Sequence, residues 1–239
     1  MCSEKTVVIH QPDFLPWLGF FQRLLSADLY LVLDNAQFLN NSRSWHNRDK
    51  IKTPQGERWL TVSVRKTAQK TPINQVLLAD NTDWRGRNLS LLKHHYRRAP
   101  FFDQIYPELE HLYRSPATTL LDFNLRSIKM LLRLFAIDIP LRFAGELNPA
   151  GSSNAMLVDL LKKTAADRYL SGNGARAYFD PEPFRKAGIK VCWQSFRHPV
   201  YPQLHGDFIP GLSSIDLFFN CGIEQSRAIL RSTMEGVRS

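Results

Sequence analysis

The residue types best suited to acid–base chemistry lie at positions 10–13, directly after an apolar stretch at 7–9. A histidine side chain has an ordinary pKa of about 6.5 and accepts a proton at neutral pH, which makes His10 the candidate general base. Prolines at 12 and 16 restrict the backbone of the connection that follows, as a rigid site requires. The alternative is a tight turn whose polar side chains only satisfy the backbone. If the segment is a site, we expect the substrate contacts to be Gln11, Asp13 and Trp17.

A second apolar stretch, residues 29–33, ends in Asp34 and Asn35, and a polar loop containing Trp45, Asn47 and Arg48 follows. We expect Asp34 to be catalytic, by orienting His10 or a substrate amine. The planar donor fork of arginine fits a phosphate group, so Arg48 is the candidate phosphate contact. Asn35 and Asn47 are expected to bind substrate beside it.

Two glycines follow a third predicted strand, residues 168–170, in the run Ser171-Gly172-Asn173-Gly174. Backbone amides without a neighbouring Cβ can approach a phosphate closely, so Ser171, Gly172 and Gly174 are expected to contact the substrate. The run lacks the third glycine of a dinucleotide fingerprint and the lysine of a P-loop, so it supports neither function. A glycine turn that leads into the next helix is the alternative.

Near the C-terminus, residues 197–210 contain too many prolines and polar residues for a strand or a helix and should form an ordered loop. We expect His198 to be catalytic and Gln203 to bind substrate. Residues 213–219 are typical of a helix start, whose free backbone amides could bind an anion. The alternative is that this segment only packs its apolar side chains onto the sheet.

These segments together resemble the WbqC-like protein family. The shared motifs are Ile9-His10-Gln11-Pro12, the turn at 15–19, the aspartate at 34, Trp45-x-Asn47-Arg48, and C-terminal motifs within 169–172, 196–203 and 206–217. The sequence departs from the family pattern at Asn35, where a second aspartate is common, and at Gly211, where asparagine is common. The resemblance implies a transferase of an acyl, aminoacyl or glycosyl group, acting on a nucleotide-linked sugar or similar activated metabolite in bacterial surface-polysaccharide or secondary-metabolite biosynthesis.

The elements that must position these residues alternate between strands and helices, which predicts an α/β fold with a mostly parallel sheet. We expect one domain over 1–239, Rossmann-like and of HUP type, with a central helical insertion at about 83–137. The HUP-type nucleotidyltransferases are a looser resemblance. Because the turn at 15–19 lacks their histidine pair, adenylyl transfer is disfavoured. The predicted strands are 6–9, 29–33, 58–64, 141–144, 168–170 and 189–194, and the predicted helices are 15–26, 83–97, 101–113, 116–137 with Ser115 as cap, 153–165 and 181–187.

Charge and composition indicate the kind of partner. The formal net charge is +9, which favours an anionic partner. One cluster of Lys and Arg spans 43–70 and includes Lys50 and Lys52, and a second ends the helix near 97. A tRNA therefore remains an alternative partner, as the carrier in aminoacyl-tRNA-dependent transfer or as the ligand of a non-catalytic nucleotide- or RNA-binding module.

Composition also bears on the cofactor and the compartment. Three cysteines, at 2, 192 and 221, make a disulfide framework improbable and favour a cytoplasmic protein. Adjacent histidines at 94 and 95 point about 100° apart on a helix and form a poor metal pair. We expect no metal, no cofactor and no transmembrane segment.

Overall fold

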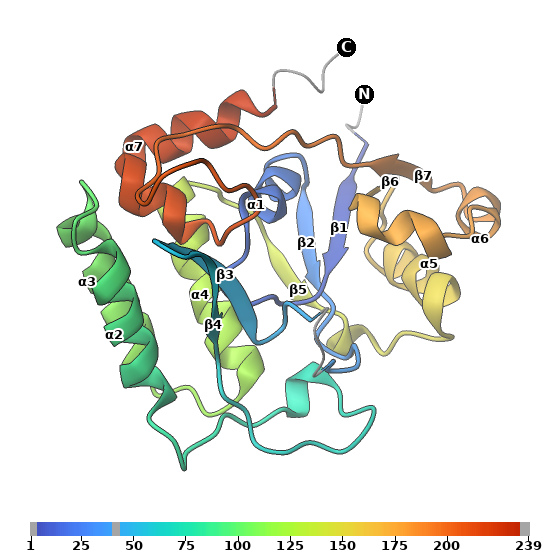
Figure 1. The fold of residues 1–239 in the computed structure, drawn as a ribbon. Helices are drawn as coiled ribbons and strands as arrows, with labels where there is room; N and C mark the ends of the chain where they lie inside the picture. Colours follow the sequence, from blue (N-terminus) through green and yellow to red (C-terminus); the bar gives the residue numbers. More distant parts are fainter. Residues whose placement is uncertain (1–3, 40–43, 235–239) are drawn as a thin grey trace.

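Five short strands form one parallel sheet at the centre of the computed structural model, which describes residues 4–39 and 44–234 (Figure 1). The strand order is β5-β2-β1-β6-β7, and each neighbouring pair is parallel. The strands are β1 (Thr6–His10), β2 (Leu29–Val32), β5 (Leu141–Phe143), β6 (Arg168–Ser171) and β7 (Lys190–Trp193). The predicted α/β fold with a mostly parallel sheet is confirmed, and the HUP-type detail stays a prediction.

Alternate side chains of β1 face two different apolar cores, because successive residues of a strand point to opposite faces of the sheet. Val8 belongs to the larger core, together with helices α1 (Leu18–Leu25), α4 (Leu120–Phe135) and α7 (Ile215–Ser232). Val7 and Ile9 belong to the smaller core, with α5 (Ser153–Lys163) and α6 (Glu182–Lys186). Figure 1 shows these two groups of helices on opposite sides of the sheet.

The predicted central helices are present as α2 (Trp84–Tyr96), α3 (Phe102–Tyr113) and α4. The start of α4 differs from the expectation, because Thr119 and not Ser115 is its cap. The Thr119 hydroxyl accepts a hydrogen bond from the backbone N–H of Asp122 at 3.2 Å, and Ser115 precedes the helix. Helix α4 contributes to the larger core that covers one face of the sheet. Helix α2 packs against α3.

The prediction of a polar loop after residue 33 is partly wrong, because this segment contains an antiparallel hairpin that is separate from the main sheet. Strand β3 (Arg48–Thr53) pairs with β4 (Gly56–Thr61), so the strand predicted at 58–64 joins this hairpin. The sequence of β3, RDKIKT, contains a single apolar residue and therefore lacks the alternation that marks a half-buried strand.

Short 3₁₀ turns join the main elements: η1 (Ile73–Gln75), η2 (Gly145–Leu147) and η3 (Asn173–Tyr178). Residues 197–210 form no helix or strand, as expected. Cys192 and Cys221 are free thiols, and Cys2 lies outside the described residues. Within the described parts of the chain, no helix has both the length and the apolar character needed to cross a membrane.

Candidate functional site

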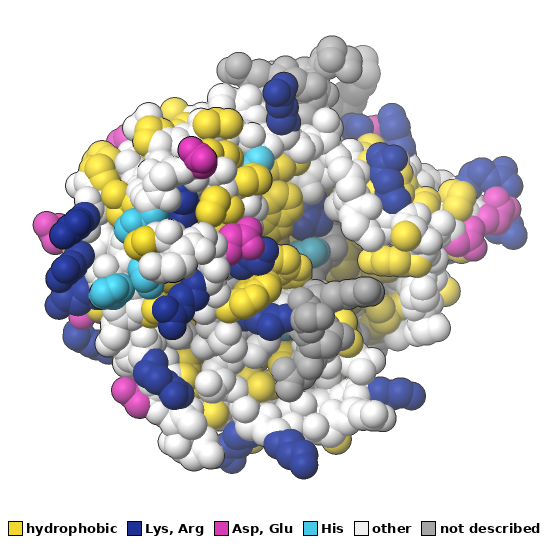
Figure 2. Space-filling model, in the orientation of Figure 1, with side chains coloured by type: hydrophobic (Ala, Val, Ile, Leu, Met, Phe, Trp, Pro, Cys, Tyr) yellow, Lys and Arg dark blue, Asp and Glu magenta, His cyan; other side chains and the backbone are white. Residues whose placement is uncertain are grey.

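A cavity of about 600 Å³ opens at the carboxyl ends of β1 and β6, the two neighbouring strands in the middle of the sheet. From β1 the chain continues outward to β2 and β5 on one side, and from β6 to β7 on the other. Ligands of open α/β sheets bind in the crevice at such a reversal of strand order. Figure 2 shows a hollow near the middle of this face, with histidine and Lys or Arg side chains inside it.

His10 and Asp13 form a hydrogen-bonded pair in the cavity lining. The distance from His10 Nε2 to Asp13 Oδ2 is 2.9 Å, and the His10 side chain is 28% exposed. Because an ionised carboxylate only accepts hydrogen bonds, Nε2 carries the proton and Nδ1 keeps its lone pair. Burial lowers the pKa of His10, the positive charge of Arg23 lowers it further, and Asp13 opposes both effects. At neutral pH, His10 is therefore an uncharged imidazole able to accept a proton.

Gln11 is oriented by a second histidine. His46 Nδ1 accepts the backbone N–H of Leu39 at 3.3 Å, so His46 Nε2 carries a proton and donates it to Gln11 Oε1 at 3.0 Å. This fixes which end of the Gln11 amide is oxygen. The amide nitrogen, which forms no hydrogen bond to any described residue, is left as a donor in the cavity lining.

The connection between β1 and α1 is held by side chains from distant parts of the chain. Asn124 of α4 donates to the backbone oxygens of Pro12 and His46, each at 2.6 Å. The hydroxyl of Ser213 donates to the Leu15 oxygen at 2.7 Å. These bonds support a left-handed backbone at Leu15, with φ of 41°, which a branched side chain rarely adopts.

The backbone amides of Ser213 and Ser214 both have acceptors, one in strand β3 and one in the connection. Ser213 N–H donates to the Lys50 oxygen, and Ser214 N–H donates to the Pro16 oxygen. Two amides of the segment 213–219, where an anion was expected, are therefore not free, because each has a backbone acceptor.

Trp17 forms a wall of the cavity, and its indole meets Phe196 edge to face at a centroid distance of 5.2 Å. The indole also lies directly over Gly19, where a Cβ atom would stand 2.3 Å from the Trp17 ring. The glycine of the turn at 15–19 is thus required by the close approach of this aromatic ring.

The opposite side of the cavity, formed by the end of β6, approaches a buried arginine. A Cβ atom on Gly172 would lie 3.0 Å from Nη1 of Arg23, a residue of α1. Ser171 and Tyr169 line the cavity beside it, joined by a 3.4 Å hydrogen bond from the Ser171 hydroxyl. Gly174 also lines the cavity and has no neighbour within 4 Å of its Cβ position.

The structure thus brings together the sequence-predicted residues of two segments, 10–17 and 171–174, and leaves the others outside the lining. Inside are His10, Gln11, Asp13, Trp17, Ser171, Gly172 and Gly174, and outside are Asp34, Asn35, Asn47, Arg48, His198 and Gln203.

Asp34 has a local role in joining the ends of β2, η1 and η2. Its carboxylate accepts the backbone N–H of Gly145 at 2.8 Å and the side chain of Asn74 at 3.1 Å. His10 therefore takes its carboxylate from Asp13, three residues along the chain, and not from Asp34. Asn35 follows Asp34, and its Oδ1 is buried with no hydrogen-bond partner among the described residues.

The predicted residues of the C-terminal loop stabilise that loop. Gln203 donates to Asp216 of α7 at 2.9 Å and to the Ile209 backbone oxygen at 3.0 Å. Burial raises the pKa of Asp216, whose carboxylate also accepts the hydroxyl groups of Tyr96 and Tyr201. His198 packs behind Phe196, with its Nδ1 3.0 Å from the Pro199 oxygen.

The hairpin residues are likewise engaged within the protein. Asn47 donates to the Val62 oxygen at 3.0 Å, and the Arg48 guanidinium lies 4.3 Å from the ring centroid of Trp59. Lys52, one of the cations assigned to the basic surface, is buried and donates to the Gly206 and Asp207 backbone oxygens. Its assignment to that surface is wrong. Arg43 of the same cluster lies outside the described residues.

Arg23 and Gln194 are lining residues that the sequence analysis missed. Both are buried, and Gln194 donates to the Gly19 oxygen at 2.7 Å. The sequence of α1, LGFFQRLL, could have indicated that Arg23 is buried, because this charged residue lies among bulky apolar ones. It also follows the buried Phe20 by three positions, which places both on one face of the helix. Gln194, at the end of β7, has no such signal.

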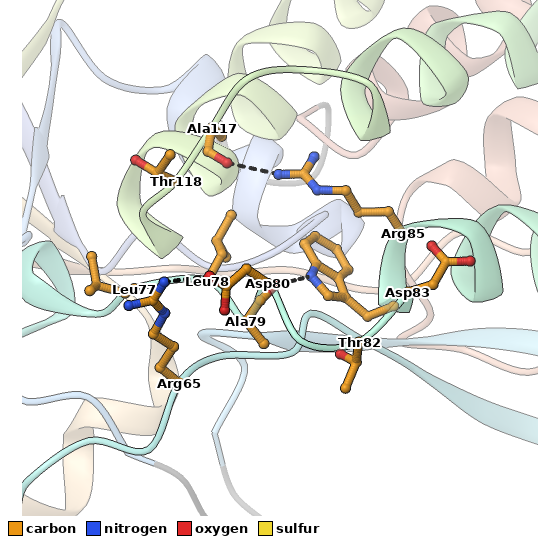
Figure 3. Close-up of a pocket in the computed structure, with 11 residues that line it drawn as sticks. Arg65, Leu77, Leu78, Ala79, Asp80, Thr82, Asp83, Arg85, Ala117 and Thr118 are labelled. Atoms are coloured by element: carbon orange, nitrogen blue, oxygen red, sulfur yellow. Dashed lines mark hydrogen bonds and ion pairs between the residues drawn. The ribbon is translucent and has the colours of Figure 1, made fainter.

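A second cavity, of about 400 Å³, lies between the segment 77–83 and the residues before α4 (Figure 3). Its charged groups already have partners. Arg65 pairs with Asp80 at 2.6 Å, and Arg85 donates to the backbone oxygens of Tyr113, Ser115 and Ala117. This cavity therefore offers a ligand fewer unsatisfied groups than the cavity at His10.

Two comparisons with known proteins found a match to this chain. Residues 11–228 match the sequence model of the WbqC-like protein family. An uncharacterized protein of Mycobacterium tuberculosis is 32% identical over 222 residues, which covers 92% of this chain and 95% of that protein. No solved structure matches the chain.

Proposed function

The chain belongs to the WbqC-like protein family, and we propose that it is a transferase acting on a nucleotide-linked sugar or a similar activated metabolite. The surface-polysaccharide or secondary-metabolite context of this proposal comes from the family resemblance. The chemistry comes from the cavity at the ends of β1 and β6. Its volume of about 600 Å³ suits a small-molecule substrate.

One observation carries the proposal, namely the hydrogen bond between His10 and Asp13 in the cavity lining. A general base must be within reach of its substrate and must be unprotonated at the working pH. The pair meets both conditions. Asp13 also stabilises the imidazolium that forms when His10 accepts a proton.

In the proposed step, an acceptor hydroxyl or amine transfers its proton to His10 Nδ1 while its oxygen or nitrogen forms a bond to the transferred group. The bond between that group and the activated carrier breaks, and its electron pair leaves with the carrier. Gln11, with its amide nitrogen facing the cavity, is placed to hold an oxygen of the substrate.

Replacement of His10 by Gln tests the proposal. Because a general base contributes about 100-fold or more to the rate, turnover should fall by at least that factor, while the melting temperature stays close to that of the unchanged protein. Native mass spectrometry of the His10→Gln protein, purified from its own host, should show a retained nucleotide-linked molecule. Extracted and supplied to the unchanged protein, that molecule is the substrate for the turnover assay.

The matched control is His111→Gln. His111 is an exposed histidine of α3 and is not a lining residue of the cavity. It should leave both turnover and melting unchanged. Full turnover by a well-folded His10→Gln variant would exclude His10 as the base.

A second candidate, aminoacyl-tRNA-dependent transfer, is favoured by a pair of aromatic residues between the cavity and a basic groove. The groove, of about 730 Å³, lies between β4 and α2 and is lined by Arg58, Arg87 and Trp59. Trp59 lies 5.4 Å from Trp45, measured between ring centroids, and Trp45 lines the cavity. Both indoles are more than a third exposed, so unpaired bases could stack on them.

A further inference from the structure

Arg23 is a buried cation with no hydrogen-bond or ion-pair partner among the residues that the structure describes. The residue is 5% exposed, and it lines the cavity from helix α1. No hydrogen bond or ion pair joins its guanidinium to any residue within 4–39 or 44–234. Its Nε is fully buried without an acceptor. The nearby carboxylate of Asp13 forms its hydrogen bond with His10.

Such an arrangement is unfavourable for folding alone. A buried charge is costly unless it is paired, and an arginine has five N–H donors to satisfy. Burial lowers the pKa of Arg23, and the charge of Asp13 opposes that effect only across a distance. Arg85 provides the contrast within the same protein, because it donates to three backbone oxygens.

The space beside Arg23 is kept open by a residue without a side chain. Gly172 approaches Nη1 so closely that a Cβ atom would stand 3.0 Å away. Larger side chains at this end of β6 would cover the guanidinium. Gln11 and Ser171, which line the same cavity, offer neutral polar groups to a bound molecule.

We propose that Arg23 binds an oxyanion of the ligand, either a carboxylate or a phosphoryl group, at the Gly172 side of the cavity. The guanidinium fork donates two parallel hydrogen bonds to such a group, and the anion supplies the negative charge that balances the positive charge of Arg23. The identity of this oxyanion as part of the transferase substrate rests on the proposed function. The binding of an oxyanion to Arg23 does not.

Calorimetry at low ionic strength with three probes tests this site: inorganic pyrophosphate, inorganic phosphate and acetate. The unchanged protein should bind at least one of them. Arg23→Met should weaken that binding by about 10- to 100-fold, the effect of losing charge-assisted hydrogen bonds, and Arg23→Lys should fall between the two. Preference for the phosphates would indicate a phosphoryl group, and preference for acetate a carboxylate.

The matched control is Arg176→Met, which removes an exposed cation near the cavity; Arg176 donates to Asn173 of the lining and is not itself a lining residue. It should bind the probes as the unchanged protein does. Arg23→Met should also melt at the same or a higher temperature, because it removes an unpaired buried charge. The proposal is overturned if Arg23→Met binds the probes as tightly as the unchanged protein does. It is also overturned if the unchanged protein binds no probe, or if Arg23→Met melts at a lower temperature than the unchanged protein.

The two proposals fail separately. If His10→Gln retains probe binding and the unchanged protein shows no transfer, the transferase proposal fails and the oxyanion site stands. If transfer depends on His10 while Arg23→Met binds every probe normally, the oxyanion site fails and the transferase stands.

Discussion

At the scale of single residues, the cavity combines a base and a cation that influence each other. The charge of Arg23 helps to keep His10 unprotonated, and Asp13 keeps the tautomer that presents Nδ1. A negative group bound at Arg23 would weaken the first effect and make His10 more basic while the substrate is present. Anion binding at Arg23 and proton transfer to His10 are thus linked through the charges of these two side chains.

The pH dependence of His10 follows from the direction of its pKa shift. Because the pKa lies below its ordinary value of about 6.5, the folded protein binds fewer protons at His10 than the unfolded chain does. The contribution of His10 to stability is therefore lost as the pH falls from about 6.5 through the folded-state pKa. An NMR titration of the His10 ring should show a midpoint below 6.5.

The same titration in Arg23→Met should move the His10 midpoint to higher pH, because a repelling positive charge is removed. Arg176→Met is the control and should leave the midpoint unchanged. A midpoint at or above 6.5 in the unchanged protein would contradict the neutral-base assignment.

At the scale of elements, the site depends on how the connection from β1 to α1 is held. This short segment carries Gln11, Asp13 and Trp17, yet its hydrogen-bond partners come from α4 and from the residues before α7. Asn124 is central, since one buried amide group donates to two backbone oxygens, that of Pro12 in the connection and that of His46 before the hairpin. The polar residues of α4 thus serve the site, while its apolar residues form the core.

Replacement of Asn124 by Ala should destabilise the fold by about 2 to 4 kcal/mol, because the Pro12 and His46 oxygens would be buried without a donor. Urea unfolding followed by circular dichroism measures this change. Turnover should fall as well, since the connection positions the His10–Asp13 pair.

Asn81→Ala provides the comparison for that variant, because Asn81 is exposed and lies in a loop. Its unfolding free energy should equal that of the unchanged protein. If the unfolding free energy of Asn124→Ala equals that of the unchanged protein, the connection from β1 to α1 keeps its shape without the hydrogen bonds from α4.

At the scale of the whole molecule, the net charge of +9 is spread unevenly. In Figure 2, Lys, Arg and His side chains gather at the left of the face, where α2 and α3 lie in Figure 1. The groove between β4 and α2 belongs to this region, and the two indoles Trp59 and Trp45 lead from it to the cavity. A long anionic molecule in the groove could thus place its end near His10.

Replacement of Arg58 and Arg87 by Glu tests this surface. If tRNA binds there, its affinity should fall, and the plot of log affinity against log salt should become less steep by about 1.4 to 1.8, the effect of losing two phosphate contacts. Fluorescence anisotropy with labelled tRNA over a range of salt concentrations gives both quantities.

The control for that variant makes the same change in net charge elsewhere, with Arg142→Glu and Lys190→Glu on the exposed edge strands β5 and β7. It should retain the salt slope of the unchanged protein. The same slope in all three proteins would assign the groove to solvated surface and remove the tRNA-dependent alternative.

The sequence by itself determined the parallel sheet and the segment around His10. Apolar strands such as residues 6–9 and helices such as 153–163 are marked by local patterns, which need no distant partner to be recognised. The polar residues after β1 and β6 were also predictable, because parallel strands place their carboxyl ends at one edge of a sheet.

Only the tertiary structure decided which polar residues share the cavity. Asp13 and Asp34 are both carboxylates near the end of a strand, and the choice of Asp13 as the partner of His10 depends on a connection shaped by α4 and Ser213. That Arg23 has no hydrogen-bond or ion-pair partner among the described residues likewise emerges only from the folded structure. Hydrogen bonds between residues more than 100 positions apart leave no local pattern, and they determine which side chains face the cavity.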